Sequence, residues 1–470
     1  MDAATNWGTS WAIRPWREGF SHMTFQRLRD PVHDLIEFSD SKFERMIWKL
    51  LETPEFQRLR RIRQLGFSDL VFPGATHSRF AHSVGVFHTA RLLCGVIEEK
   101  LGRNFDPEAA ETVICAALVH DLGHGPFSHA FESALDMRGK HEAWTEKIIL
   151  SDSMSAIMNG YRKNMSADVA RIFKEETSPN IYSSVVSSQF DADRLDYMRR
   201  DRMMTGTQIG GIDFTWLLRN LEVCKIDVGV DDEKYAEIDT LVLGSKALWA
   251  GESYVLSLFQ LYPNVYLHKT TRGAEQLFAH MMQQIKGFVD ERADVRTGLP
   301  SDHPLIRYLR EQSLSNYLDL DDAVIWGSLP LIAKSSDPLL SQTSDDLRYR
   351  RLPKAFDVGR GLAGGHLNPD ARKSAKFARL LGEARKENQS LDYRILCDRS
   401  ARNPYKRGSY DSPKAIQRIH ILVEGRPVDL ADESAVVKAL MPFEVNRLYT
   451  RPDDHEARQV IESLVQEALS

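Results

Sequence analysis

An apolar helix that runs into an adjacent histidine and aspartate is the feature that most constrains how this chain can fold. Residues 116–119 are Ala-Ala-Leu-Val, and His120 and Asp121 follow them directly. Glycines at positions 123 and 125 and a proline at 126 then end the helix. An imidazole and a carboxylate buried at a helix end are costly unless they are paired or bind a cation. The sequence therefore predicts helices packed around a polar site, in which His120 and Asp121 bind a metal ion.

Two more metal ligands are expected on neighbouring helices. Seven of the 15 histidines lie between positions 77 and 141, and His82 among them is the first candidate. Asp193 is the second, because Asp193, Tyr197 and Asp201 are spaced by four residues and share one helix face. Mixed nitrogen and oxygen ligands suit Mn, Fe, Ni, Co or Zn, and Mg less well. An aromatic ring and a second carboxylate beside the metal would suit a sugar.

A structural role is the alternative for each of these residues. A single histidine in a helix is more often a core or surface residue than a ligand, and a single His-Asp pair is weak evidence. The pair here is followed by Gly-His-Gly-Pro, with one histidine upstream and one aspartate downstream on apolar helices. That combination favours the metal site.

The composition is that of an ordinary globular chain. Apolar residues make up 42% and charged residues 27% of its 470 residues, and the net charge is −5. This charge argues against a polynucleotide partner, which usually requires a basic stripe. The four cysteines form no CxxC pair, so we expect reduced thiols in a cytoplasmic protein rather than a zinc ribbon or disulfides. No apolar run approaches the ~20 residues of a membrane helix, so we expect no membrane partner.

The periodicity of the apolar residues predicts a mainly α protein in three parts. These are an N-terminal extension of residues 1–29, a helical core of residues 30–330 and a smaller mixed α/β region of residues 331–470. Spacings of three and four predict core helices over Ser41–Leu51, Pro54–Gln64, Ser83–Leu101, Pro107–Leu122, Phe127–Met137 and Ala192–Met204. A long helix is expected from Lys246 to about Phe288.

Strands are expected in two places. Alternating residues on either side of Asp231-Asp232 predict a small β-hairpin of Val223–Val230 and Tyr235–Leu243. In the C-terminal region we predict a Gly-rich mobile loop at Gly359–Gly365 and strands at Asp392–Cys397 and Arg418–Val423. A turn at Glu424-Gly425 and a final helix over Asp454–Leu469 are expected after them.

Several segments in the same order resemble one known family. They are Asp30–His33, Glu52–Arg60, Gln64–Gly66, Val71–Ser83, His120–His129, His141-Glu142, Asp193–Asp201, Leu267-His268 and, more faintly, Ser335–Pro353. This pattern resembles the HD-domain superfamily, and within it the deoxynucleoside triphosphate (dNTP) triphosphohydrolases of the sterile-alpha-motif/HD type. The resemblance runs from Asp30 to about Asp357 and implies an HD-domain helical core. No sterile-alpha-motif domain is visible.

The resemblance implies a role for each matched residue. His82, His120, Asp121 and Asp193 would be the four metal ligands. Arg79 would grip phosphate, a task that suits the planar guanidinium. The remaining substrate residues would be Gln64 and Leu65 against the sugar, Tyr197 and Asp201 at the deoxyribose and its 3′-hydroxyl, and Arg194 and His268. The acid/base group and its supporting residues would be His124, His129, His141 and Glu142, with His141 as the expected proton donor.

The reaction implied by the resemblance is attack of a metal-bound water at the α-phosphate, which releases a deoxynucleoside and triphosphate. Two departures bear on selectivity. Arg194 stands where the family has lysine, and Arg272 stands near a position where the family has an aromatic residue. The alternatives are an HD-type phosphodiesterase or nuclease acting on nucleic acid or a cyclic dinucleotide, and a nucleotide sensor without activity.

Regulation by a nucleotide is a further expectation. Glu52, Gln57 and Arg60 match positions that read an activating nucleotide, GTP or a dNTP, in animal members of the family. The alternative for this stretch is an amphipathic helix with an exposed basic face. The resemblance also implies a homo-oligomer, a dimer, tetramer or hexamer, and a role in nucleotide-pool control or antiviral defence.

Overall fold

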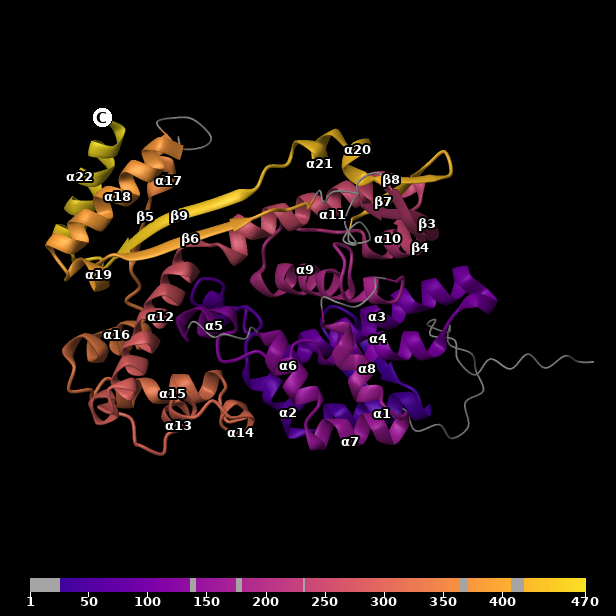
Figure 1. Cartoon of the computed structure of the whole chain (residues 1–470), viewed down its shortest axis with the longest axis horizontal. Helices are drawn as coiled ribbons and strands as arrows, with labels where there is room; N and C mark the ends of the chain where they lie inside the picture. The colour runs from indigo at the N-terminus through magenta and orange to yellow at the C-terminus, as the bar shows by residue number, and fades with distance from the viewer. Residues whose placement is uncertain (1–25, 136–140, 175–179, 231–232, 364–370, 407–417) are drawn as a thin grey trace, which may run out of the picture.

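The computed structural model describes residues 26–135, 141–174, 180–230, 233–363, 371–406 and 418–470. Helices dominate these residues, and the strands form three small sheets (Figure 1). The predicted fold class, a mainly α protein with small β regions, is confirmed.

The N-terminal part is helical after one short hairpin. Strands β1 (Gln26–Asp30) and β2 (Asp34–Phe38) pair antiparallel, which the sequence did not predict, and β1 begins inside the range expected to be an extension. Ten helices follow in the described residues: α1 (Lys42–Leu51), α2 (Pro54–Arg58), α3 (Arg79–Leu101), α4 (Pro107–Val119), α5 (His129–Leu135), α6 (His141–Ile149), α7 (Asp152–Tyr161), α8 (Met165–Ile172), α9 (Ala192–Thr205) and α10 (Phe214–Arg219).

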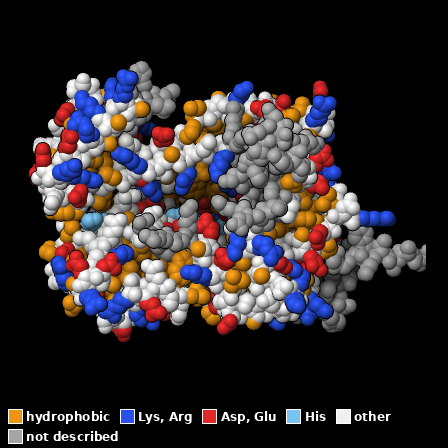
Figure 2. All heavy atoms as spheres, viewed as in Figure 1, with side chains coloured by type: hydrophobic (Ala, Val, Ile, Leu, Met, Phe, Trp, Pro, Cys, Tyr) orange, Lys and Arg blue, Asp and Glu red, His pale blue; other side chains and the backbone are white. Residues whose placement is uncertain are grey.

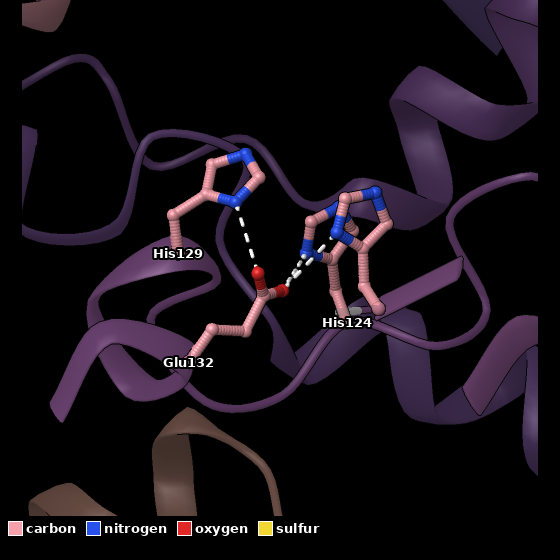
Figure 3. A group of neighbouring side chains, drawn as sticks. His124, His129 and Glu132 are labelled. Atoms are coloured by element: carbon pink, nitrogen blue, oxygen red, sulfur yellow. Dashed lines mark hydrogen bonds and ion pairs between the residues drawn. The ribbon is translucent and has the colours of Figure 1, made fainter. Parts of the chain in front are cut away.

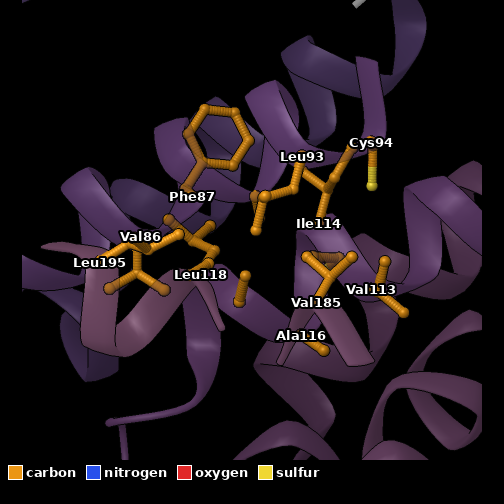
Figure 4. Close-up of a cluster of buried hydrophobic side chains, with 14 of the residues drawn as sticks. Val86, Phe87, Leu93, Cys94, Val113, Ile114, Ala116, Leu118, Val185 and Leu195 are labelled. Atoms are coloured by element: carbon orange, nitrogen blue, oxygen red, sulfur yellow. The ribbon is translucent and has the colours of Figure 1, made fainter. Parts of the chain in front are cut away.

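Helix α3 lies at the centre of the core and packs against both α4 and α9. Apolar side chains from the three helices meet there, including Val86, Leu118 and Leu195, all fully buried (Figure 4). By length and apolar composition α3 could cross a membrane, but 72% of its apolar window is buried inside the protein. This packing brings His82 on α3, His120 at the end of α4 and Asp193 on α9 to one place.

Three predicted helices are shorter than expected. The helix predicted over Pro107–Leu122 ends at Val119. The helix predicted over Pro54–Gln64 ends at Arg58, and a 3₁₀ turn over Leu59–Arg61 leads into extended backbone at Ile62. The chain must extend there because Arg63 forms a β-bridge with Ser78, the cap of α3. The helix predicted over Phe127–Met137 begins at His129, because Phe127 and Ser128 have φ angles of 53° and 57°. Residues 136 and 137 lie outside the described residues.

The hairpin predicted after residue 222 is present as β3 (Leu221–Val230) and β4 (Glu233–Leu243); the turn at 231–232 lies outside the described residues. The single long helix expected after it is wrong. Helix α11 (Leu248–Leu261) passes into a π-helical turn (Tyr262–Tyr266), and α12 (Lys269–Asp290) starts anew with His268 as its cap. Pro263 explains the break, because proline lacks the backbone donor and clashes with the preceding turn.

The remainder of the chain mixes helices and strands. Its elements are α13 (Pro304–Arg310), α14 (Leu314–Leu318), α15 (Asp322–Ile332), α16 (Pro338–Arg348), β5 (Lys354–Asp357), α17 (Val358–Ala363), α18 (Ala371–Glu387), α19 (Leu391–Arg394), β6 (Leu396–Arg402), β7 (His420–Val423), β8 (Arg426–Asp429), α20 (Leu430–Glu433), α21 (Ala435–Ala439), β9 (Phe443–Thr450) and α22 (His455–Leu469). Leu340 and Leu347 pack in one cluster with Phe278 and Ile306, so the core continues past residue 330. The division at residue 330 stays a prediction.

Predictions for the C-terminal region are partly corrected. Residues 359–363 of the expected mobile loop are helical in α17, and 364–365 lie outside the described residues. The strand predicted over Asp392–Cys397 starts only at Leu396, because α19 takes up Leu391–Arg394. The turn at Glu424-Gly425 is confirmed, with φ angles of 49° and 80°.

The C-terminal strands attach this region to the core. Strand β7 joins the hairpin sheet in the order β3-β4-β7-β8, with Leu243 opposite Ile421. Strands β5, β9 and β6 form a second sheet, and β6 and β9 run side by side toward the first one (Figure 1). The end of β6 is thereby carried to the neighbourhood of α9 and α11.

Candidate metal centre and active site

Three of the four predicted ligands converge closely. The imidazoles of His82 and His120 and the carboxylate of Asp193 each offer a ligand atom within 4.8 Å of the others. Asp121 completes the group, with Oδ1 at 3.3 Å from His120 Nε2 and Oδ2 at 3.8 Å from His82 Nε2. His82 is fully buried and Asp121 nearly so. The arrangement predicted from the sequence, a His-Asp pair joined by an upstream histidine and a downstream aspartate, is present.

A hydrogen bond at Nδ1, on the side of the ring away from the metal group, fixes the orientation of both histidines. His82 Nδ1 lies 2.8 Å from Asp196 Oδ2, and His120 Nδ1 lies 2.9 Å from the carbonyl oxygen of Ala117. In each ring the Nδ1–H donates to that oxygen, so Nε2 faces the common centre. Such second hydrogen bonds set the tautomer of a metal-binding histidine and raise its basicity.

These residues fit a divalent cation. His120 Nε2 is buried and lies 3.3 Å from Asp121 Oδ1 and 3.7 Å from Asp193 Oδ1, without the geometry of a hydrogen bond to either. Ligand atoms bound to one cation at ~2.1 Å lie ~3–3.5 Å from one another. Two imidazole nitrogens with two carboxylate oxygens form a donor set that suits a first-row transition ion. The group could therefore hold a metal.

The electrostatics of the group reflect its four close charges. Burial lowers the pKa of His82, but hydrogen bonds to Asp193 and Asp196 outweigh burial and raise that pKa to about 10. Burial raises the pKa of Asp193, whereas the nearby imidazoles of His120 and His82 lower it well below its ordinary value. Without a cation, protonated imidazoles balance the negative charge of these carboxylates. A cation at this centre would balance the same charge.

Arg79 reaches the centre from the first turn of α3. Its Nη1 donates to Asp121 Oδ2, and its Nε donates to the hydroxyl of Ser128 at 2.9 Å. Burial raises the pKa of Asp121, but the charges of Arg79, His120 and His124 together lower it well below its ordinary value, so the carboxylate stays ionised. The structure thus places a buried arginine directly beside a metal ligand.

Three histidines gather around one carboxylate next to the metal group. Glu132 on α5 lies 3.2–3.4 Å from the Nδ1 atoms of His124, His129 and His141 (Figure 3). The rings of His124 and His141 stack with centroids 3.9 Å apart. His124 Nε2 lies 3.3 Å from Asp121 Oδ1, which joins this cluster to the metal group.

The histidines of this cluster differ in exposure. The His129 side chain is 68% exposed and that of His141 18%, while His124 is buried. Burial, followed by the Arg79 and His141 charges, lowers the pKa of His124 to about 3, so His124 is neutral near pH 7. Glu142 Oε2 lies 3.6 Å from His141 Nδ1 and is half-exposed.

The predicted sugar-binding side is walled by aromatic rings. Asp201 accepts a hydrogen bond from the Tyr266 hydroxyl at 2.9 Å and lies 2.8 Å from His77 Nε2. The Tyr197 and Tyr266 rings meet edge to face with centroids 6.0 Å apart. Both tyrosines have pKa values raised far above the ordinary range by burial, so their hydroxyls remain protonated donors.

The other predicted substrate residues lie in three different environments. The Gln64 side-chain oxygen is buried without a hydrogen-bond partner in the described residues, and Leu65 packs against the core. His268 Nδ1 accepts from the Thr270 amide at the start of α12, and its ring meets Phe72 edge to face. Arg194 donates to Asp191 and to the Ser188 carbonyl oxygen.

The other departure from the family, Arg272, forms ion pairs with Asp398 of β6 and with Glu275. It therefore links α12 to the C-terminal sheet.

Of the three residues predicted to read an activator, Glu52 and Arg60 are exposed and Gln57 is partly buried. Arg60 donates to Gln57 Oε1 at 2.8 Å, and its guanidinium lies 3.5 Å from the centre of the Phe80 ring. Glu52 accepts from the Trp48 indole at 2.8 Å. Gln57 and Arg60 are in contact, and Glu52 has a partner of its own.

Sequence reasoning missed several residues that hold the site together. Asp196 binds His82, and Glu132 binds three histidines; each stands three residues after a predicted site residue, so helical spacing could have indicated both. Asp196 is in turn held by Arg200 and His33. Tyr266 gave no local signal, because its position depends on the π-helical turn.

Fold and site together define a helical protein with an adjacent His-Asp pair in a group that could hold a divalent cation. The HD-domain family model matches residues 79–198, which include all four predicted ligands. The uncharacterized protein YwfO of Bacillus subtilis (strain 168) is 32% identical over 415 residues, or 88% of each chain. A phosphohydrolase structure from Bacteroides thetaiotaomicron VPI-5482 covers 91% of this chain and is itself fully covered, at 25% identity and a TM-score of 0.71.

A relative with a named activity matches a smaller part. The deoxynucleoside triphosphate triphosphohydrolase SAMHD1 of Mus musculus is 29% identical over 271 residues, which are 50% of this chain and 39% of that protein. The chain belongs to the HD-domain family and is an HD-domain phosphohydrolase similar to SAMHD1.

Proposed function

We propose that this protein hydrolyses deoxynucleoside triphosphates to deoxynucleosides and triphosphate. The observation that carries the proposal is the order of groups in the site. The metal group contacts the histidine cluster through Asp121 and His124, Arg79 lies beside it, and Tyr197 follows Asp193 by one turn of α9, next to Tyr266 and Asp201. These are in turn a reacting centre, a proton donor, a phosphate ligand and a sugar site. Similarity to SAMHD1 supports the same substrate class.

Each residue has a distinct task in this reaction. His82, His120, Asp121 and Asp193 would hold the cation. A divalent cation there would supply a water of lowered pKa and polarise a phosphoryl oxygen. Arg79 would donate to phosphate oxygens from a buried position, where such contacts are strong. These five groups would orient the α-phosphate.

The leaving sugar oxygen needs a proton, and the histidine cluster can supply it. Glu132 faces the Nδ1 atoms of three rings and leaves their Nε2 atoms for other partners. His124 Nε2 is taken up by Asp121. We therefore assign proton donation to His141, with His129 and Glu142 as its neighbours in the cluster.

Tyr197 and Asp201 would bind the deoxyribose and its 3′-hydroxyl, with Gln64 and Leu65 against the sugar and His268, which packs on Phe72, as a further substrate contact. The hydroxyl of Tyr266 and the ring of His77 already fix the Asp201 carboxylate. A sugar hydroxyl could therefore bind a pre-oriented acceptor.

Activation by GTP or a dNTP at Glu52, Gln57 and Arg60 remains part of the proposal, as does a homo-oligomer to host that site. The stacking of Arg60 on Phe80, at the first turn of α3, would connect it to the helix of Arg79 and His82. This part would be contradicted if the protein hydrolysed each dNTP alone at a rate that no second nucleotide changed.

The test is hydrolysis of each dNTP, alone and in mixtures, with Mg or Mn and with product separation by chromatography. We expect deoxynucleoside and triphosphate, lost in the double variant His120→Ala, Asp121→Ala. His455→Ala is the matched control, since His455 is exposed at the start of α22, away from the site residues in the sequence. No dNTP loss under any mixture would overturn the proposal and favour a phosphodiester substrate.

A polynucleotide substrate has less support. Lys and Arg side chains alternate with Asp and Glu over the described surface that Figure 2 shows, rather than forming one basic stripe.

A further inference from the structure

A cavity next to the metal centre joins the helical core to the C-terminal region. It has a volume of about 340 Å³ and is lined from the core by Gln189, Arg194, Tyr254 and Tyr262. From the C-terminal region it is lined by residues 401–406. Arg194 follows the expected metal ligand Asp193 directly in α9, and the Asp193 charge acts on Tyr262 in the cavity wall, so the cavity lies near the metal group.

The charge of the cavity is positive. Arg194, Arg402 and Lys406 line it, and none of its described lining residues is Asp or Glu. Arg194 is already paired with Asp191. Within the described ranges the Arg402 side chain donates to the Ala401 carbonyl oxygen, and neither Arg402 nor Lys406 forms an ion pair. Two exposed cations therefore face the same cavity as a tyrosine pair.

Arg402 lies within electrostatic reach of the centre. Burial raises the pKa of Tyr262, both Arg194 and Arg402 lower it, and Asp193 raises it again. One phenol thus responds to the cation of the C-terminal region and to a metal ligand. Tyr262, in the cavity wall, therefore lies close enough to both Arg402 and Asp193 for their charges to act on it.

The 402–406 segment is held in place by specific contacts. Gln189 Nε2 donates to the Lys406 carbonyl oxygen at 3.0 Å, and the Lys406 amide donates to Gln189 Oε1 at 2.7 Å. The Tyr254 hydroxyl donates to the Gln189 carbonyl oxygen at 2.8 Å. Buried Tyr405 donates to Asp429 Oδ1 at 2.6 Å. This side of the cavity is therefore preorganised, which reduces the entropy lost on binding.

We propose that this cavity binds the distal phosphates of the substrate, and that Arg402 and Lys406 of the C-terminal region are their ligands. The inference rests on the proposed function: with the α-phosphate at the metal group, the β- and γ-phosphates would occupy this positively charged cavity, which Arg194 lines next to the ligand Asp193. Guanidinium and ammonium groups are the usual protein ligands of such oxygens. The C-terminal region then determines that a triphosphate, rather than a monophosphate, is the preferred substrate.

Binding of inorganic triphosphate to the metal-loaded protein tests the cavity without any reaction. Calorimetry should show that Arg402→Ala weakens the binding of triphosphate by about tenfold, or about 1.4 kcal/mol. Arg402→Lys should retain part of the affinity. Arg399→Ala is the matched control, because Arg399 lies on the same strand, is exposed and is not among the lining residues. Equal affinity of Arg402→Ala and wild type, or equal losses in Arg402→Ala and Arg399→Ala, would overturn the inference.

Kinetic measurements of turnover can test this inference separately from the proposed reaction. With a dNTP, Arg402→Ala and Lys406→Ala should raise KM and leave kcat nearly unchanged. With bis(p-nitrophenyl) phosphate, which has no distal phosphates, both variants should act like wild type. Triphosphate binding that depends on Arg402 in a protein inactive on every dNTP would support the cavity and overturn the reaction. Normal KM values for dNTPs in both variants would overturn the cavity and leave the reaction intact.

Discussion

His82 presents one ring nitrogen to the metal group and the other to Asp196, whose Oδ2 lies 2.8 Å from His82 Nδ1. Asp196 is itself fixed by two nitrogens of Arg200 and by His33 Nε2 at 2.7 Å. All of these side chains are buried. The orientation of His82 therefore depends on Asp196, whose oxygens contact His82 Nδ1, Arg200 and His33 and do not face the metal group.

Asp196→Asn should lower metal affinity by about 10- to 100-fold, the usual effect of removing such a supporting residue. An amide cannot accept from His82 while also meeting Arg200 and His33. The measurement is a competitive titration of metal-free protein with Mn or Zn against a chelating dye.

The control is His33→Gln, which removes a different partner of the same carboxylate and leaves the His82 contact. It should reduce stability while keeping most of the metal affinity. If the two variants lose affinity equally, general loosening of the core explains the effect and the role of Asp196 as a positioning residue is rejected.

Gly123→Ala should displace the start of α6 and reduce both stability and activity. A Cβ at this position would lie 2.0 Å from the His141 carbonyl oxygen and 2.3 Å from the Thr145 amide nitrogen. Overpacking of this kind costs about 1–3 kcal/mol, and here it moves the residue assigned as proton donor. Thermal unfolding and dNTP turnover measure the two effects.

Gly382→Ala in α18 is the matched comparison. A Cβ added at Gly382 would have no described atom of another element within 4 Å, and an alanine in an open helix is expected to stabilise by about 0.5–1 kcal/mol. A Gly123→Ala protein as stable and active as the Gly382→Ala protein would show that the contact between α6 and residue 123 is not important.

Local patterns were sufficient to predict the part of the site that lies on regular helices. His82, Asp193 and the His120-Asp121 pair could be found because each sits on an apolar helix whose buried face is set by spacing. The family resemblance supplied Arg79 and the histidine cluster. The packing of α3 between α4 and α9 then fixed the centre.

Long-range contacts were beyond local patterns, and one backbone break was missed. Arg200 binds Asp30 across 170 positions, and nothing in either segment alone specifies its partner. Tyr266 reaches Asp201 through the helix break near Pro263. Apolar spacing predicted one continuous helix there, although Pro263 was a local signal against it.

His141→Gln should lower kcat for a dNTP by about a hundred- to ten-thousandfold, because the leaving sugar oxygen is a strong base and needs a proton. The loss should be small with bis(p-nitrophenyl) phosphate, since p-nitrophenolate leaves without protonation. The ratio of the two losses is the decisive measurement.

His129→Gln is the comparison variant, because its ring lies in the same cluster with its Nδ1 at 3.4 Å from Glu132. A substrate-dependent loss in His129→Gln, with none in His141→Gln, would transfer the role of proton donor to His129. Equal losses with both substrates would instead indicate a role in binding phosphate.

Acid should destabilise the sheet that joins the C-terminal region to the core through His420. Burial lowers the pKa of this β7 histidine to about 4 from an ordinary value of 6.5, with Asp429 opposing and Arg418 reinforcing the shift. The folded state therefore binds its proton less readily than the unfolded state. The stability is fully present above pH 6.5 and is lost as the pH falls through about 4.

His420→Gln should remove this contribution to the pH dependence. Urea unfolding at several pH values between 7 and 4 measures the free energy of unfolding of both proteins, and one proton contributes a slope of at most about 1.4 kcal/mol per pH unit. Carboxylates add the same background to each, so the difference between the curves isolates His420. His455→Gln, which changes an exposed histidine, should follow the wild-type curve. Parallel curves for His420→Gln and wild type would mean that His420 takes up its proton equally in both states.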